Sequence, residues 1–207
     1  MSTMTLFHSP LSPFVRKVMV VLHETGQLQR VQLQPVNISP VSGDPQLNQG
    51  NPIGKIPALR LEDGTVLHHS RVICEYLDQQ HVGLPLLPRE GSARWRRLTL
   101  VSQADAVLDA AVSCRYESFL RPEDKRWDGW LQAQGDKIRR SLANLEQEHL
   151  LELMSGFDLA AIGVACALGY LDLRQPEFGW REQQPGLAAW YAEVSKRPSM
   201  VATSPQA

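Results

Sequence analysis

A short segment near the start of the chain, Ser12-Pro13-Phe14, places a hydroxyl at a predicted helix start. Pro13 suits the first position of a helix, and Ser12 suits the N-cap position before it. A helix N-terminus presents unpaired N–H groups and the positive end of the helix dipole, which favour an anion. A hydroxyl here can donate a hydrogen bond to that anion, and a role for Ser12 as a helix cap alone is the alternative interpretation.

A second segment, Asn51 to Leu59, joins turn residues to an apolar run that begins at a proline. Because proline has no N–H donor, Pro57 fits the first residue of a strand and not its interior. Only about 5–6% of X-Pro bonds in folded proteins are cis. The spacing alone therefore favours an ordinary loop in which the bond between Ile56 and Pro57 is trans.

Three further polar residues stand beside these segments. Lys55 lies in the same loop, His69 ends a predicted strand, and Ser70 opens the helix that follows and suits its cap. For Lys55 a solvated loop lysine, and for His69 a surface histidine, are equally good interpretations. No cysteine or carboxylate stands at a ligand spacing from His8, His68 or His69, so we expect no metal site.

The elements that must position these residues follow a βαβ order and then a ββα order. Apolar alternation and turn residues predict strands at 5–8, 31–36, 56–61 and 65–68, and helical spacing predicts helices at 14–24 and from 70 onward. Asp63-Gly64 predicts a hairpin turn. The βαβ unit implies parallel strands and the hairpin an antiparallel pair, which is a thioredoxin-like arrangement.

The second half of the chain has helical patterning and no strand signal. Helices are expected at 92–120, 127–154, 157–171 and 185–196, and Ser155 to Asp158 fits a capping box that opens the buried third helix. Glycine and prolines between residues 81 and 88 indicate a linker. We therefore expect an α/β domain over 1–80, a linker over 81–88 and an all-α domain over 89–207.

Composition indicates a globular enzyme without a nucleic-acid or membrane partner. The 207 residues are 43% hydrophobic and 21% charged, with a formal net charge of -1. Three widely spaced cysteines favour a reduced intracellular protein, and we expect a cytoplasmic location. The start of the chain does not resemble a signal peptide, and the most apolar stretch is too short to cross a bilayer.

Two of these segments resemble one family. The string Asn51 to Leu59 closely resembles the segment that carries the cis-proline in cytosolic glutathione S-transferases. The phrase Ser12 to Val18 resembles the first-helix start of serine-type bacterial and zeta-like members. Over residues 4–80 the resemblance implies the thioredoxin-like domain of that family, with an all-helical domain after it. It also implies that the Ile56-Pro57 bond is cis.

The resemblance implies a role for each candidate residue, with glutathione as co-substrate and no metal. The Ser12 hydroxyl would stabilise the glutathione thiolate, with Ser9 as a weaker rival, and the backbone of Ile56, before Pro57, would bind the cysteinyl part. Ser70 would bind the γ-glutamyl end, and Lys55 would neutralise the glycine carboxylate. His69 stands where the family usually has an acid or glutamine. A neutral imidazole cannot pair with an ammonium as a carboxylate does.

The resemblance implies a homodimeric glutathione transferase that conjugates glutathione to a small electrophile, whose identity the sequence does not specify. The alternative is a protein of the same fold without transferase activity that acts through protein contacts, as the stringent starvation proteins do. His69 supports that alternative, whereas Ser12, Ser70 and the Ile56-Pro57 motif oppose it. A glutaredoxin-type redox role is less favoured, because Ser12 occupies the position of the nucleophilic cysteine.

Overall fold

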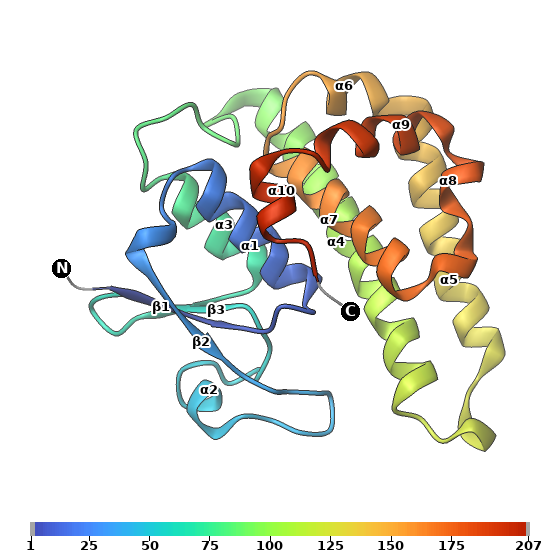
Figure 1. Cartoon of the computed structure of the whole chain (residues 1–207), viewed down its shortest axis with the longest axis horizontal. Helices are drawn as coiled ribbons and strands as arrows, with labels where there is room; N and C mark the ends of the chain where they lie inside the picture. The colour runs from blue at the N-terminus through green and yellow to red at the C-terminus, as the bar shows by residue number, and fades with distance from the viewer. Residues whose placement is uncertain (1–2, 206–207) are drawn as a thin grey trace. The chain divides into compact units, whose positions relative to one another are not determined.

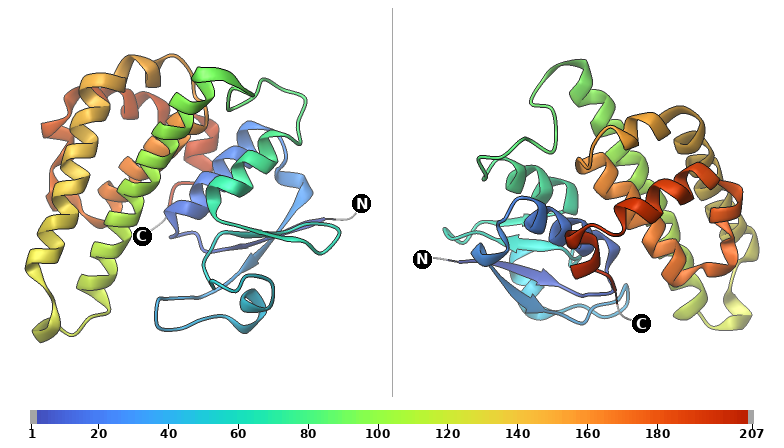
Figure 2. Two further views of the ribbon diagram at one scale, coloured as in Figure 1. Left: turned by 180° about the vertical axis from the view of Figure 1, so that it is seen from behind. Right: turned by 45° about the horizontal axis from the view of Figure 1, so that its top comes forward.

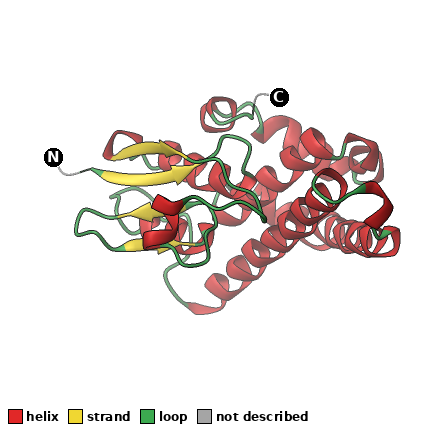
Figure 3. Cartoon of the chain, turned by 90° about the horizontal axis from the view of Figure 1, so that it is seen from below, coloured by secondary structure: helices red, strands yellow, loops and turns green. Residues whose placement is uncertain are grey.

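The structure is a computed structural model that describes residues 3–205, and these residues form two compact units. The first unit contains residues 3–89 together with residues 198–205, and the second contains residues 90–197. Within the described residues, strands occur in the first unit and the second is helical (Figure 3). The predicted fold class is confirmed, whereas the domain boundaries at residues 80 and 89 remain predictions.

The first unit is built on a mixed four-stranded sheet with the order β2-β1-β3-β4 (Figure 1). β1 pairs with β2 in parallel, and β3 is antiparallel to both β1 and β4. This arrangement confirms the expected βαβ unit and the hairpin. The strands are β1 (Met4–His8), β2 (Val31–Pro35), β3 (Ala58–Arg60) and β4 (Val66–His68).

Helices cover both faces of this sheet (Figures 1 and 2). α1 and α3 pack against each other on one face, and the short α2 lies on the other. On the α2 side, Phe7, Leu47 and Ala58 form a buried apolar cluster. The helices of this unit are α1 (Pro13–Glu24), the 3-10 turn η1 (Leu28–Arg30), α2 (Pro45–Gly50), α3 (Ser70–Asp78) and α10 (Pro198–Ala202).

The end of α1 is fixed by a glycine in the left-handed region. Gly26 has φ 66°, and its N–H donates to the His23 carbonyl at 3.2 Å. The next N–H, from Gln27, donates to the Leu22 carbonyl at 2.8 Å. These two bonds form the Schellman motif, which satisfies carbonyls that the helix end leaves unpaired, and α1 ends at Glu24, where the predicted helix over 14–24 ends.

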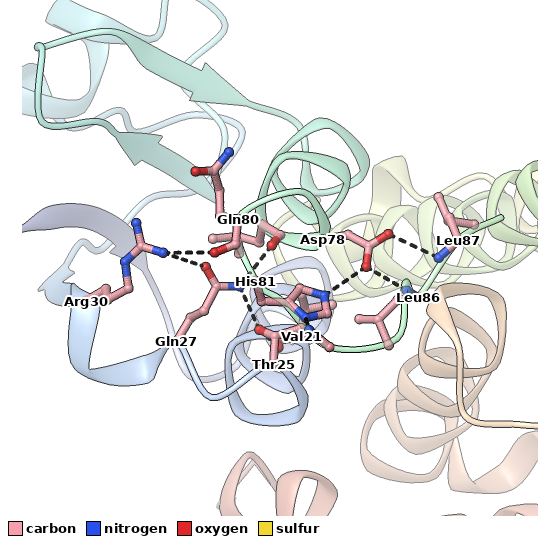
Figure 4. A network of polar contacts seen from close by, with 11 residues as sticks. Val21, Thr25, Gln27, Arg30, Asp78, Gln80, His81, Leu86 and Leu87 are labelled. Carbon is pink, nitrogen blue, oxygen red and sulfur yellow. Dashed lines mark hydrogen bonds and ion pairs between the residues drawn. The ribbon is translucent and has the colours of Figure 1, made fainter. Parts of the chain in front are cut away.

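The segment after α3 is held by the carboxylate of Asp78 (Figure 4). Asp78 accepts hydrogen bonds from the backbone N–H groups of Leu86 at 2.6 Å and Leu87 at 3.1 Å. Its Oδ1 also lies 3.2 Å from His81 Nε2. On the α1 side, the Gln27 amide donates to the carbonyl of Leu77 at 2.9 Å. The contacts of Asp78 therefore hold residues 81–88 against the first unit.

A short helix far along the chain also belongs to the first unit. The sequence did not predict α10, which packs on α1. The Arg16 guanidinium donates to the Met200 carbonyl at 3.1 Å, and the Ser199 hydroxyl donates to the Glu24 carboxylate at 2.5 Å. Arg16 is buried on α1, and its guanidinium finds the Met200 carbonyl and the Thr203 hydroxyl as acceptors there.

The second unit is a helical assembly in which α4 packs along both α5 and α7 (Figure 2). Thirteen residues of α7 are buried, as expected for a core helix. Among the described residues, no helix is both long and apolar enough to span a membrane. The elements are α4 (Gly91–Phe119), η2 (Glu123–Lys125), α5 (Asp128–Asn144), η3 (Leu145–His149), α6 (Leu150–Met154), α7 (Leu159–Arg174), η4 (Pro176–Phe178), α8 (Trp180–Gln183) and α9 (Pro185–Val194).

The predicted capping box at the start of α7 is wrong in its assignment of the cap. Asp158 is the N-cap, and its carboxylate accepts from the Ala161 N–H at 3.0 Å. Ser155 instead ends α6, where its hydroxyl donates to the Glu152 carbonyl at 2.7 Å. Arg97 selects this arrangement, because its Nε lies 2.8 Å from Asp158 and its Nη2 donates to the Ser155 hydroxyl at 3.0 Å.

Candidate active site

The register of the sheet brings the three candidate segments to one end of the first unit. Ala58 of β3 pairs with Phe7 of β1 on one side and with His68 of β4 on the other. Pro57, directly before Ala58, therefore lies next to the last residues of β1 and β4. The same end receives the loop that leads from β1 to Ser12, and the His69-Ser70 step.

Ser12 is the N-cap of α1, as the sequence predicted. Its backbone is extended, with φ −81° and ψ 119°, and its Oγ accepts a hydrogen bond from the Val15 N–H at 3.3 Å. Because a hydroxyl can accept and donate at once, this cap bond leaves the Ser12 hydrogen able to donate. Ser9 lies in the preceding turn, where its carbonyl accepts from the Ser12 N–H at 3.1 Å.

The loop before β3 is held in shape by a buried asparagine. The peptide bond between Ile56 and Pro57 is cis, which confirms the prediction. The Asn51 side chain is fully buried, donates to the Lys55 carbonyl at 2.7 Å and accepts from the Ile53 N–H at 3.3 Å. The sequence analysis treated Asn51 only as a turn former, yet its amide fixes the backbone that leads into Ile56. The Lys55 side chain itself is exposed.

The start of α3 differs from the prediction at one point. His69, not Ser70, is the N-cap, and its side chain makes no capping hydrogen bond. Its backbone has φ 74° and ψ 123°, a conformation that costs a non-glycine residue about 1–3 kcal/mol. Ser70 is already the first helical residue, so its buried hydroxyl points to another partner. The predicted cap role of Ser70 is therefore wrong, whereas its position at this end of the sheet is as expected.

A residue that the sequence analysis did not select, Lys17, lies beneath Ser70. Lys17 is 0% exposed on α1, and its Nζ donates to Ser70 Oγ at 3.5 Å. A fully buried lysine is uncommon unless polar atoms receive its ammonium group. No local signal in the sequence could indicate this contact, because the partner is 53 residues away.

The charges and dipoles at this end of the sheet favour an anionic ligand. α1 and α3 both begin here, and each N-terminus contributes unpaired N–H groups and the positive end of a helix dipole. Burial lowers the pKa of His8, at the end of β1, below its usual 6.5 and so favours the neutral imidazole. Among residues 3–205, no three His, Cys, Asp or Glu side chains gather in a way that could hold a metal ion.

Sequence models of two domains match this chain. The glutathione S-transferase N-terminal domain matches residues 6–85, and the glutathione S-transferase C-terminal domain matches residues 128–193. The chain belongs to the glutathione S-transferase family. Within that family, the uncharacterized GST-like protein YibF of Escherichia coli is 34% identical over 206 residues, which cover 98% of each chain.

Solved structures of other family members have the same fold as this chain. A glutathione transferase family member from Pseudomonas fluorescens Pf-5, with bound glutathione, has a TM-score of 0.98 and 64% sequence identity. A second structure from that strain, with bound S-(propanoic acid)-glutathione, has a TM-score of 0.93 and 62% identity. Both comparisons cover 99% of this chain and 100% of the other.

Proposed function

We propose that this protein is a glutathione transferase that ionises the thiol of glutathione and joins it to a small electrophile. The observation that carries the proposal is the position of Ser12, which caps α1 while keeping a hydrogen to donate. Family members of 64% and 62% identity with bound glutathione and a glutathione conjugate support the same conclusion.

In this proposal, each candidate residue contacts a different part of glutathione. Ile56, before the cis bond to Pro57, offers its backbone to the cysteinyl part. Ser70 receives the γ-glutamyl carboxylate, His69 lies at the γ-glutamyl end, and the exposed side chain of Lys55 approaches the glycine carboxylate. A solvent-side contact of this last kind contributes little to affinity, about 0–1 kcal/mol.

Stabilisation of the thiolate is the main chemical contribution of the protein. A hydrogen bond to a charged group is worth roughly 1.5–3 kcal/mol, which corresponds to a thiol pKa lowered by about 1–2 units. A thiol with a pKa of about 8.5 would then be largely ionised at neutral pH, with its proton released to solvent.

The conjugation step forms one carbon–sulfur bond. The thiolate donates an electron pair to the electrophilic carbon of the second substrate. A leaving group departs with its bonding pair, or, for an activated alkene, the adjacent carbon takes up a proton. The protein contributes orientation and a stabilised nucleophile, and the second substrate supplies the electrophilic centre.

The proposal is tested by binding and turnover with defined ligands. Calorimetry with glutathione should give saturable binding, and S-methyl glutathione, which has no ionisable thiol, should bind without releasing a proton to the buffer. Conjugation of glutathione to a panel of haloarenes and activated alkenes should then be detected by mass. A chain that is folded but binds neither tripeptide contradicts the proposal.

A role through protein contacts alone has less support. His69 in place of an acid supports this role, but Ser12 caps α1 with its hydroxyl hydrogen left to donate. Family members of 64% and 62% identity were solved with bound glutathione and with a bound glutathione conjugate. We therefore do not favour a protein that has lost glutathione binding.

We further propose a homodimer in the cytoplasm. Closed two-fold pairing is the commonest assembly of soluble oligomers, and the family implies it for this chain. The three cysteines are buried and form no disulfide within the described residues, which suits a reducing compartment.

A further inference from the structure

Lys17 has a role that the sequence and the family comparison leave unassigned. It is fully buried on α1, and its ammonium group donates to the hydroxyl oxygen of Ser70 at 3.5 Å. We propose that Lys17 is a positioning residue that turns the Ser70 hydroxyl into an obligatory donor toward the γ-glutamyl carboxylate of glutathione. This inference rests on the proposed function, because it concerns the same site.

The direction of the hydrogen bond follows from the chemistry of the two groups. A lysine ammonium has three donors and no acceptor, so the Ser70 oxygen must accept in this contact. The hydroxyl hydrogen of Ser70 is then directed away from Lys17. Without Lys17, the same hydroxyl could rotate and present its oxygen, which would repel a carboxylate.

The location of Ser70 gives that hydrogen a specific use. Ser70 is the first residue of α3, so its own N–H belongs to the unpaired donors at a helix N-terminus. A carboxylate at this point can receive both the N–H and the oriented O–H of one residue. An ammonium at the same point would meet two donors and the positive end of the helix dipole. Lys17 and Ser70 together therefore favour a ligand with this carboxylate over a ligand that lacks it.

The test uses two analogues that differ from glutathione at one group each. Glutaryl-Cys-Gly keeps the γ-glutamyl carboxylate and lacks the ammonium, whereas 4-aminobutyryl-Cys-Gly keeps the ammonium and lacks the carboxylate. A charge-assisted hydrogen bond accounts for about a tenfold change in affinity or more. Lys17→Met keeps an unbranched side chain in the apolar surroundings. Calorimetry should show that it lowers the affinity for glutathione and for glutaryl-Cys-Gly about tenfold. The affinity of this variant for 4-aminobutyryl-Cys-Gly should stay within about twofold of the wild-type affinity.

A double-mutant cycle separates positioning from general stability. Ser70→Ala should show the same ligand pattern as Lys17→Met, and Lys17→Met should have no further effect when added to Ser70→Ala. If Lys17→Met does not fold, Lys17→Gln replaces it. Its amide can still donate to the Ser70 oxygen, so preference for the carboxylate should persist.

The inference would be overturned if Lys17→Met lowered the affinity for all three ligands equally, or if the two substitutions had additive effects in the cycle. Either result would leave the proposed function intact. Loss of carboxylate preference in a folded Lys17→Gln variant would also overturn it. Wild-type protein that binds none of the three ligands would remove the proposed function and this inference together.

Discussion

The carboxylate of Glu146 accepts a 2.6 Å hydrogen bond from the backbone N–H of Leu187, 41 residues further along the chain. It also accepts from the Gly186 N–H at 2.8 Å, so one side chain satisfies two of the donors at the start of α9. Glu146 lies in the π-helical turn η3, between α5 and α6. A π-helical turn changes the direction of the side chains it carries, and here it aims a carboxylate at a helix N-terminus.

Removal of this carboxylate should destabilise the protein. Glu146→Ala leaves two backbone donors without their partner, and we expect the free energy of unfolding to fall by about 2 kcal/mol. Glu146→Gln keeps one acceptor oxygen and should lose about half as much. Urea unfolding followed by circular dichroism gives both values. Glu148→Ala, an exposed position in the same turn, is the matched control and should be neutral. Equal losses for Glu146→Ala and Glu148→Ala would contradict the assignment.

The two roles of Ser12 can be separated by substitution. If its hydroxyl stabilises the thiolate, Ser12→Ala and Ser12→Gly should both raise the pKa of bound glutathione by about 1–2 units. Thiolate absorbance of the complex against pH measures this. The cap role should respond differently, because alanine at an N-cap costs about 1 kcal/mol and glycine only a few tenths. Superimposable titrations for wild type and both variants would leave Ser12 as a cap alone.

Affinity for glutathione should increase when His69 is replaced by an acid. His69→Glu places a carboxylate opposite the glutamyl ammonium, and an exposed pair of this kind is worth about 0.2–1 kcal/mol, a gain of up to about fivefold. His69→Gln, which has similar length and no charge, is the control. Both variants keep a Cβ atom at φ 74°, so they retain the same backbone strain. Calorimetry in which His69→Glu binds no more tightly than His69→Gln would place the ammonium elsewhere.

The stability of the protein should depend on pH through His8. Burial lowers the pKa of His8 in the folded state below 6.5, so the unfolded chain binds a proton more readily. The contribution of this residue is therefore fully present above about pH 6.5 and is lost as the pH falls toward the folded-state value. His8→Asn should flatten this part of the curve of unfolding free energy against pH. Parallel curves for variant and wild type between pH 8 and about 5 would exclude a role for His8.

The mass of the protein in solution tests the proposed dimer. Light scattering at micromolar concentration should give about twice the chain mass of 23.2 kDa. A concentration series down to the nanomolar range would then measure the strength of the association. A monomer mass at micromolar concentration would contradict the homodimer.

Local chemistry made much of the first unit predictable. The Ser12 cap, the Gly26 stop and the Asp63-Gly64 turn each depend on residues within a few positions of one another, so the sequence carries the whole signal. The cis bond at Pro57 was different, because spacing alone favoured trans and only the resemblance of the whole segment predicted cis.

The features that were missed depend on distant partners. Ser155 and Asp158 both fit the cap of α7, and the choice between them is made by Arg97, about sixty residues earlier. Lys17 reads as a solvated helix residue until Ser70 is placed against it. The roles of the candidate site residues toward glutathione remain predictions, since they concern a ligand and not the chain.

The attachment of α10 to α1 has a consequence for how the protein is made. Translation releases Arg16 early, but the Met200 carbonyl that accepts its hydrogen bond follows 184 residues later. The first unit therefore emerges from the ribosome while the Arg16 guanidinium still lacks this acceptor and the face of α1 that packs against α10 is uncovered. Only a chain extended through residues 198–205 can close that surface. Closure of this face of the first unit therefore follows synthesis of the whole helical unit, residues 90–197.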